Sequence, residues 1–140
     1  MKLALSVPST PEMLSSIRHT VLDWLDGAGF RGERAHDVLV VVSELVTNGV
    51  IHDGGDDIEL YLTKDDKGIS IEVVTIGQRS ISEALRFRGA TGMSESGRGL
   101  IVVDALTDVL SIEDNHGRHH VICHVSIDQQ AGTVLPVLLN

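Results

Sequence analysis

Hydrophobic and polar residues alternate in several short stretches of the chain, which is the pattern of strands that bury one face. The stretches cover Leu3–Val7, Ile58–Thr63, Ile69–Val73, about Val109–Glu113 and about His119–Ile127. Turn sequences separate the second stretch from the third (Asp65–Gly68) and the fourth from the fifth (Asn115–Gly117). We therefore expect five strands, four of them joined in pairs by turns.

Apolar residues recur at helical spacing in other segments. Thr10 is a good N-cap for a first helix that continues until Gly27. A second helix is expected over about Glu33–His52, and the apolar run Leu100–Leu106 predicts a third, mostly buried helix. The order strand, helix, helix, strand, strand, helix, strand, strand predicts an α+β fold with a largely antiparallel sheet and helices on one face.

Length and composition are typical of one globular domain, which we place at residues 1–140 with a C-terminal tail at 128–140. The formal charge of −9 disfavours nucleic-acid binding, because affinity for a duplex depends on basic residues that neutralise phosphates. No apolar run approaches the ~20 residues that span a bilayer, and no signal-peptide pattern opens the chain. We expect a soluble, cytoplasmic protein that binds neither nucleic acid nor membrane.

The second predicted helix carries Glu44 and Asn48, which lie one above the other because they are four residues apart. A solvated polar face is the ordinary explanation of such a pair. However, Val40 and Val41 also lie off the main apolar stripe, so we expect a second, partly buried surface there. A carboxylate in such a place can act as a base, and an Asn oxygen suits Mg²⁺, which prefers oxygen ligands.

A glycine-containing stretch, Ser96–Leu100, ends a long segment without clear periodicity and opens the third predicted helix. Glycines let the backbone approach a ligand closely, and the free N–H groups of a helix N-terminus attract an anion. By itself such a stretch is more often a simple turn at the start of a helix. It gains meaning beside the Glu44 and Asn48 pair.

Together the two motifs resemble the GHKL, or histidine-kinase-like, ATPase superfamily, and within it the bacterial anti-sigma-factor serine kinases. The resemblance covers roughly Leu3 to Ile127 and implies a two-layer α/β sandwich with a mixed, mostly antiparallel sheet. It also implies that Glu44 is the catalytic base and that Asn48 holds Mg²⁺. The same resemblance assigns phosphate binding to the glycine motif, whose residues are Gly97, Arg98, Gly99 and Leu100.

One stretch departs from the family pattern, in which an Asp-x-Gly-x-Gly motif follows the hairpin and its Asp accepts the adenine amino group. Here the Asp position is Thr75, the first glycine is kept as Gly77, and the second is replaced by Arg79. A hydroxyl can still accept a hydrogen bond, but a neutral bond replaces a charge-assisted one, at a loss of about 1 kcal/mol or more. The nucleotide-binding set implied by the family therefore includes Thr75 and Gly77.

The histidines and the single cysteine need separate interpretation. His52 lies one turn after Asn48 and either borders the nucleotide pocket or caps the helix. Four histidines suggest a metal site by number, but His120 and His124 are about 13 Å apart along a strand, too far to share one ion. The four are His116, His119, His120 and His124. Cys123 alternates with apolar residues and is expected to be buried.

Two functions follow from the resemblance. The first is an ATP- and Mg²⁺-binding, anti-sigma-type regulator that binds a sigma factor and/or its antagonist protein and phosphorylates a serine on the antagonist. The alternative is a non-catalytic partner-binding module with weak or lost ATP binding. Thr75 and Arg79 favour the module, whereas Glu44 and Asn48 favour the enzyme. A hydrolase that uses His52-Asp53 is a weaker hypothesis, and a homodimer is left open.

Overall fold

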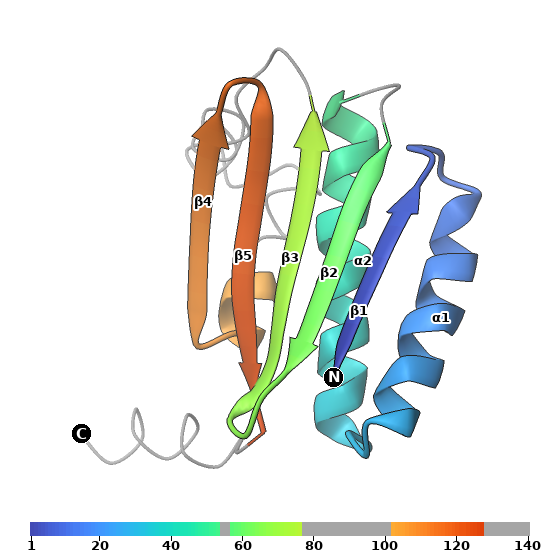
Figure 1. Ribbon diagram of the computed structural model, residues 1–140, viewed down its shortest axis with the longest axis vertical. Helices are drawn as coiled ribbons and strands as arrows, with labels where there is room; N and C mark the ends of the chain where they lie inside the picture. The colour runs from blue at the N-terminus through green and yellow to red at the C-terminus, as the bar shows by residue number, and fades with distance from the viewer. Residues whose placement is uncertain (54–56, 77–101, 128–140) are drawn as a thin grey trace.

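The computed structural model describes residues 1–53, 57–76 and 102–127, without the side chains of residues 50–53 (Figure 1). In chain order, the elements are β1 (Lys2–Val7), α1 (Met13–Gly27), α2 (Glu33–Asp53), β2 (Ile58–Lys64), β3 (Gly68–Ile76), β4 (Val109–Asn115) and β5 (Arg118–Ser126). Residues 102–106 are also helical and precede β4. No helix in these ranges is long and apolar enough to cross a membrane.

The strands form one sheet in the order β1-β2-β3-β5-β4, and every neighbouring pair is antiparallel. Figure 1 shows α1 and α2 on one side of this sheet, so that its other side is left uncovered by the described helices. This arrangement confirms the predicted α+β sandwich with helices on one face. The predicted strands and helices all have counterparts in the part of the chain that the structure describes.

The β2–β3 turn is held by a single carboxylate. Asp65 Oδ1 accepts hydrogen bonds from the backbone N–H of Lys67 (2.8 Å) and of Gly68 (2.9 Å). These bonds favour the ionised carboxylate and lower the pKa of Asp65. Gly68 is required at this turn, because a Cβ would lie 2.1 Å from the carbonyl oxygen of Val125 on β5.

The core between sheet and helices is aliphatic. α1 contributes Ile17, Val21 and Leu25, and their 3- and 4-residue spacing places them on one face of the helix. The buried face of α2 is wider than the sequence stripe, since Val41 is fully buried together with Val38 and Val42. Val41 therefore belongs to the main core and not to a second surface, which corrects the sequence interpretation. Further core side chains come from the alternate positions of β2, β3 and β5, together with Val7 of β1, Phe30 and Val103.

The start of the first helix differs from the prediction. α1 begins at Met13, and no side chain caps it. The backbone carbonyl of Thr10, and not its hydroxyl, accepts a hydrogen bond from the N–H of Met13 (3.1 Å). Pro11 and Glu12 form the turn that leads into the helix, so Thr10 precedes the helix as part of that turn.

Candidate functional site

The site is built where α2 approaches β3. Gly49 of α2 lies against Thr75 of β3: a Cβ on Gly49 would be 2.8 Å from Thr75 Cγ2 and 3.2 Å from Ile58 Cδ1. A side chain at position 49 would push the helix away from the strand. The glycine therefore lets α2 pack directly on Thr75. Gly49 follows Asn48 in the sequence.

Two buried polar groups, on Thr75 and on the neighbour of Gly49 in α2, have no hydrogen-bond partner among the described residues. Asn48 is 7% exposed and Thr75 is 1% exposed. Asn48 Nδ2 and Thr75 Oγ1 both lack a partner, although most buried polar side-chain atoms in folded proteins have one. An unpaired buried donor or acceptor costs about 1–3 kcal/mol. Asn48 precedes Gly49 on α2, and Thr75 is the residue that Gly49 meets, so these two groups mark this part of the molecule as a candidate ligand site.

Thr75 lies within β3 and not at its end. It is the penultimate residue of the strand and is paired in register with His119 of β5. Paired residues of neighbouring antiparallel strands point to the same face, so both side chains project toward the helices. His119 is 3% exposed, and its Nδ1 is 2.7 Å from Oδ1 of Asp114 on β4. The sequence considered His119 only for a metal site; its place beside Thr75 follows from strand register, which a single sequence does not reveal.

Glu44 lies one turn before Asn48 on α2 and is more exposed than Asn48. It is half-buried and lines a shallow hollow of about 200 Å³ on the outer side of the helix pair. The hollow is lined by Arg18, His36, Leu39, Val40, Ser43 and Glu44. The structure therefore places the predicted base and the predicted magnesium ligand on the same stretch of α2, with Asn48 buried and Glu44 open to solvent.

Several predicted site residues lie outside the described part of the chain. They are Gly77, Arg79, Gly97, Arg98, Gly99 and Leu100, together with the side chain of His52 and the tail at 128–140. The described residues hence supply the helix and strand side of the candidate site, namely Glu44, Asn48 and Thr75. To these the structure adds His119.

Three of the candidate metal-site histidines are each paired with acidic side chains of neighbouring segments. His119 pairs with Asp114, His120 Nδ1 lies 2.6 Å from Glu72 Oε2, and His124 Nδ1 lies 3.0 Å from Asp108 Oδ1. Within the described ranges, no three His, Cys, Asp or Glu side chains are grouped to hold a metal ion. Cys123 is buried as expected, and burial raises the pKa of its thiol to about 12.

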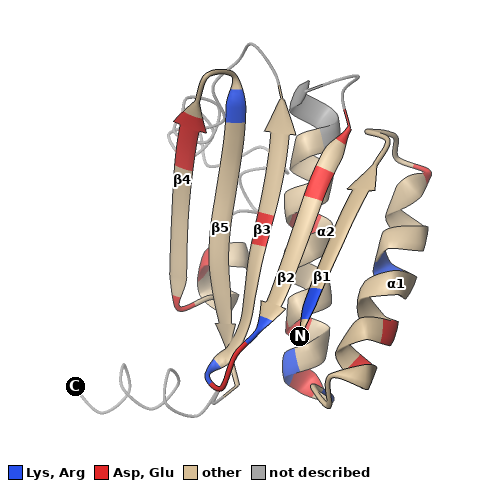
Figure 2. Cartoon of the chain, viewed as in Figure 1, with Lys and Arg blue, Asp and Glu red and all other residues tan. Residues whose placement is uncertain are grey.

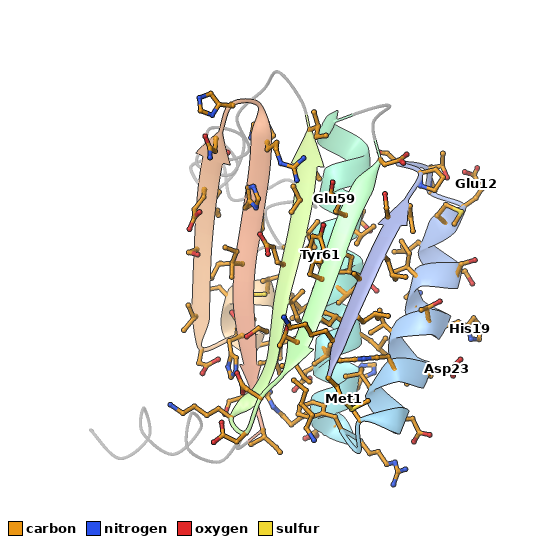
Figure 3. All side chains as sticks on the ribbon, viewed as in Figure 1. Met1, Glu12, His19, Asp23, Glu59 and Tyr61 are labelled. Atoms are coloured by element: carbon orange, nitrogen blue, oxygen red, sulfur yellow. The ribbon has the colours of Figure 1, made fainter. Side chains whose placement is uncertain are left out.

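The uncovered sheet face also carries polar pairs. Figure 3 shows Glu59 and Tyr61 on the side of β2 that faces away from the helices. The Tyr61 hydroxyl donates to Glu59 Oε1 (2.7 Å), and Arg118 Nη2 lies 3.1 Å from the same oxygen. The hydrogen bond from Tyr61, and then Arg118, hold the pKa of Glu59 below its usual value. Figure 2 shows a few acidic and basic positions along the strands, among mostly uncharged ones.

Comparisons with known proteins agree with this arrangement. The chain is 27% identical over 124 residues to the anti-sigma F factor of Clostridium acetobutylicum, an alignment that covers 84% of this chain and 87% of the relative. The identical fraction is modest, but the alignment spans most of both proteins.

Solved structures share the fold. The crystal structure of the RsbU and RsbW domains of Rv1364c from Mycobacterium tuberculosis matches with a TM-score of 0.68 and 20% identity, over 90% of this chain and 32% of that one. This chain thus spans about a third of the Mycobacterium chain. The SiaB-SiaC complex of Pseudomonas aeruginosa contains a chain that matches with a TM-score of 0.59 and 14% identity, over 89% of each chain.

The sequence from residue 7 to residue 124 matches the family described as the histidine kinase-like ATPase domain. This match includes α1, α2, the β2–β3 hairpin, and the contact of Gly49 with Thr75. The chain therefore belongs to the histidine kinase-like ATPase family.

Proposed function

We propose that the chain binds ATP with Mg²⁺ at the contact of α2 and β3 and works as an anti-sigma-type regulatory protein. The observation that carries the nucleotide part is the pair of buried polar groups without partners, Asn48 Nδ2 and Thr75 Oγ1. Asn48 lies on α2 and Thr75 on β3. The family resemblance assigns Mg²⁺ binding to the first residue and adenine binding to the second. Their burial and their unmet hydrogen bonds fit a polar ligand that binds beside the Gly49–Thr75 contact.

Each described residue has a defined task in this proposal. The side-chain oxygen of Asn48 is a hard donor suited to Mg²⁺, which when bound neutralises charge on the phosphates. The Thr75 hydroxyl forms a hydrogen bond with the adenine ring of the nucleotide. Gly49 has no side chain, so α2 packs closely on β3 beside it. Glu44, which is half-buried one turn before Asn48, would meet an incoming hydroxyl group and take its proton.

The regulatory part of the proposal rests on the relative from Clostridium acetobutylicum, which is an anti-sigma F factor. By analogy, the partners of this chain are a sigma factor and/or an antagonist protein that carries the phosphorylated serine. The solved SiaB-SiaC complex also pairs a chain of this fold with a second protein. Transfer would move the γ-phosphoryl group of ATP to the serine oxygen, while the serine proton passes to the carboxylate of Glu44 and ADP leaves.

The first test measures nucleotide binding through thermal stability. Millimolar ATP with Mg²⁺ is expected to raise the melting temperature, because a ligand that binds only the native state stabilises it by mass action. Asn48→Ala should remove the dependence of that rise on Mg²⁺. Asn115→Ala is the matched control, since Asn115 is the exposed last residue of β4 and its replacement should leave the ligand-induced rise unchanged. No rise in the wild-type protein would contradict ATP binding and favour the non-catalytic module.

The second test concerns Glu44. Glu44→Gln should abolish phosphorylation of a cognate antagonist but leave the ATP dissociation constant unchanged, because the base acts on the acceptor and not on the nucleotide. Glu33→Gln, in the first turn of the same helix, controls for loss of a charge on α2. Phosphoryl transfer retained by Glu44→Gln would show that another group is the base.

A further inference from the structure

The chemistry of Thr75 differs from that of the aspartate for which it stands. Its Cγ2 methyl is the atom that meets Gly49, so the methyl branch is the one that packs on the helix. Its hydroxyl is buried and has no hydrogen-bond partner among the described residues. A hydroxyl carries one donor and two acceptor positions, and its hydrogen rotates to suit the group that it meets.

An ionised carboxylate at this position would behave differently, because it can only accept hydrogen bonds. It bonds the 6-amino group of adenine and repels the 6-carbonyl oxygen of hypoxanthine or guanine. A hydroxyl accepts from the amino group and donates to the carbonyl group equally well. Replacing the carboxylate by a hydroxyl therefore removes the electrostatic reason for rejecting a 6-oxo purine.

Among the described residues, the groups around Thr75 do not restore an accept-only site. On the helix side Thr75 meets Gly49, and the side chain that also lies against Gly49 is the apolar Ile58 of β2. On the β5 side the register partner of Thr75 is His119, a side chain that carries ring nitrogens and no carboxylate. The nearby carboxylate of Asp114 lies with its Oδ1 2.7 Å from His119 Nδ1. The carboxylate nearest in register is thus engaged with the imidazole.

We propose that this site accepts purine nucleoside triphosphates with either a 6-amino or a 6-oxo group, in place of strict selection for adenine. The inference rests on the nucleotide-binding function proposed above and assigns the base selectivity to Thr75. Since one neutral hydrogen bond is exchanged for another, the ATP and inosine triphosphate dissociation constants should agree within about threefold. Inosine triphosphate is the sharpest probe, because its base differs from adenine only at position 6 and in the N1 proton that accompanies the carbonyl.

The experiment is isothermal calorimetry of the full chain with ATP and with inosine triphosphate, both with Mg²⁺ at one salt concentration. Thr75→Ser keeps the hydroxyl and should keep the affinity ratio. Thr75→Val keeps the shape without the hydroxyl and should weaken both nucleotides by similar factors of about 2 to 10. Thr75→Asp should favour ATP over inosine triphosphate by about tenfold or more, because a buried carboxylate rejects the carbonyl.

The outcomes separate this inference from the function on which it rests. Binding of ATP together with rejection of inosine triphosphate by more than about tenfold would overturn the inference and leave ATP binding intact. Unchanged affinities in Thr75→Val would also overturn it, since the hydroxyl would then not touch the base, and this arm does not depend on Thr75→Asp folding. Failure of both nucleotides to bind the wild-type chain would overturn the nucleotide-binding function itself.

Discussion

At the scale of single residues, Asn48 and Thr75 show how a candidate site can be recognised from buried polar atoms whose missing hydrogen bonds lower the stability of the fold. Both are almost fully buried, and each leaves a polar atom without a partner in the described structure. The motif in α2 identified Asn48, and alignment with the family pattern identified Thr75. Their burial was not predictable, because it depends on how closely α2 packs on the sheet. His119 was missed as a neighbour of Thr75, since that pairing joins residues 44 positions apart.

Gly49 offers a direct test of this close packing. An alanine Cβ would lie 2.8 Å from Thr75 Cγ2 and 3.2 Å from Ile58 Cδ1, both on buried β-branched side chains with little freedom to move. We expect Gly49→Ala to lower the free energy of unfolding by about 1–2 kcal/mol, although alanine favours a helix interior by about 1 kcal/mol. Urea denaturation provides the measurement.

Gly27→Ala is the matched control for this change. Gly27 is the last residue of α1, and a Cβ there would meet no atom within 4 Å. The control should therefore be neutral or slightly stabilising, through the lower entropy of the unfolded chain. If Gly49→Ala were as stable as Gly27→Ala, α2 would not be held against Thr75 as closely as the structure places it.

At the scale of elements, the alternation of hydrophobic and polar residues predicted the strands well where only one face of the strand is buried. It failed where both faces of the strand are buried. The predicted third strand ended at Val73, but β3 continues to Ile76. Val73, Val74 and Thr75 are all buried in succession, so the two-residue period disappears there. This extension matters for the proposed function. It places Thr75 within β3, paired with β5, although the predicted strand ended two residues before it.

The helices illustrate a similar limit. The bounds of α2 agree with the expected range to within a residue, because a long stretch of suitable spacing leaves little choice. The apolar stripe nevertheless underestimated its buried face, which also includes Val41 and the polar Asn48. α2 is covered by the sheet on one side and by α1 on another, so more than one stripe of its surface is removed from water.

For the whole molecule, the family resemblance predicted the layer arrangement, but two hydrogen bonds that join the helical segments to the sheet come from residues that no motif includes. Lys64 Nζ donates to the carbonyl of Ala28 (2.8 Å), joining the end of β2 to the segment after α1. Arg34 Nε donates to the carbonyl of Ser126 (2.8 Å), joining α2 to the end of β5. These bonds connect residues that are 36 and 92 positions apart, and a single sequence taken alone does not indicate such pairs.

Arg34 and Asp37 allow this connection to be tested. Arg34 Nη1 lies 2.6 Å from Asp37 Oδ2, and the side chains are only 15% and 11% exposed. Arg34→Met would leave the Asp37 carboxylate buried without its partner, and removal of one member of a buried pair costs about 3–5 kcal/mol. Adding Asp37→Leu removes the stranded charge, so the double variant should regain most of that loss in urea denaturation. It should stay about 1 kcal/mol below wild type, because the Ser126 carbonyl has still lost its Arg34 donor. A double variant no more stable than Arg34→Met would mean that the bond to the sheet, and not the ion pair, carries the stabilisation.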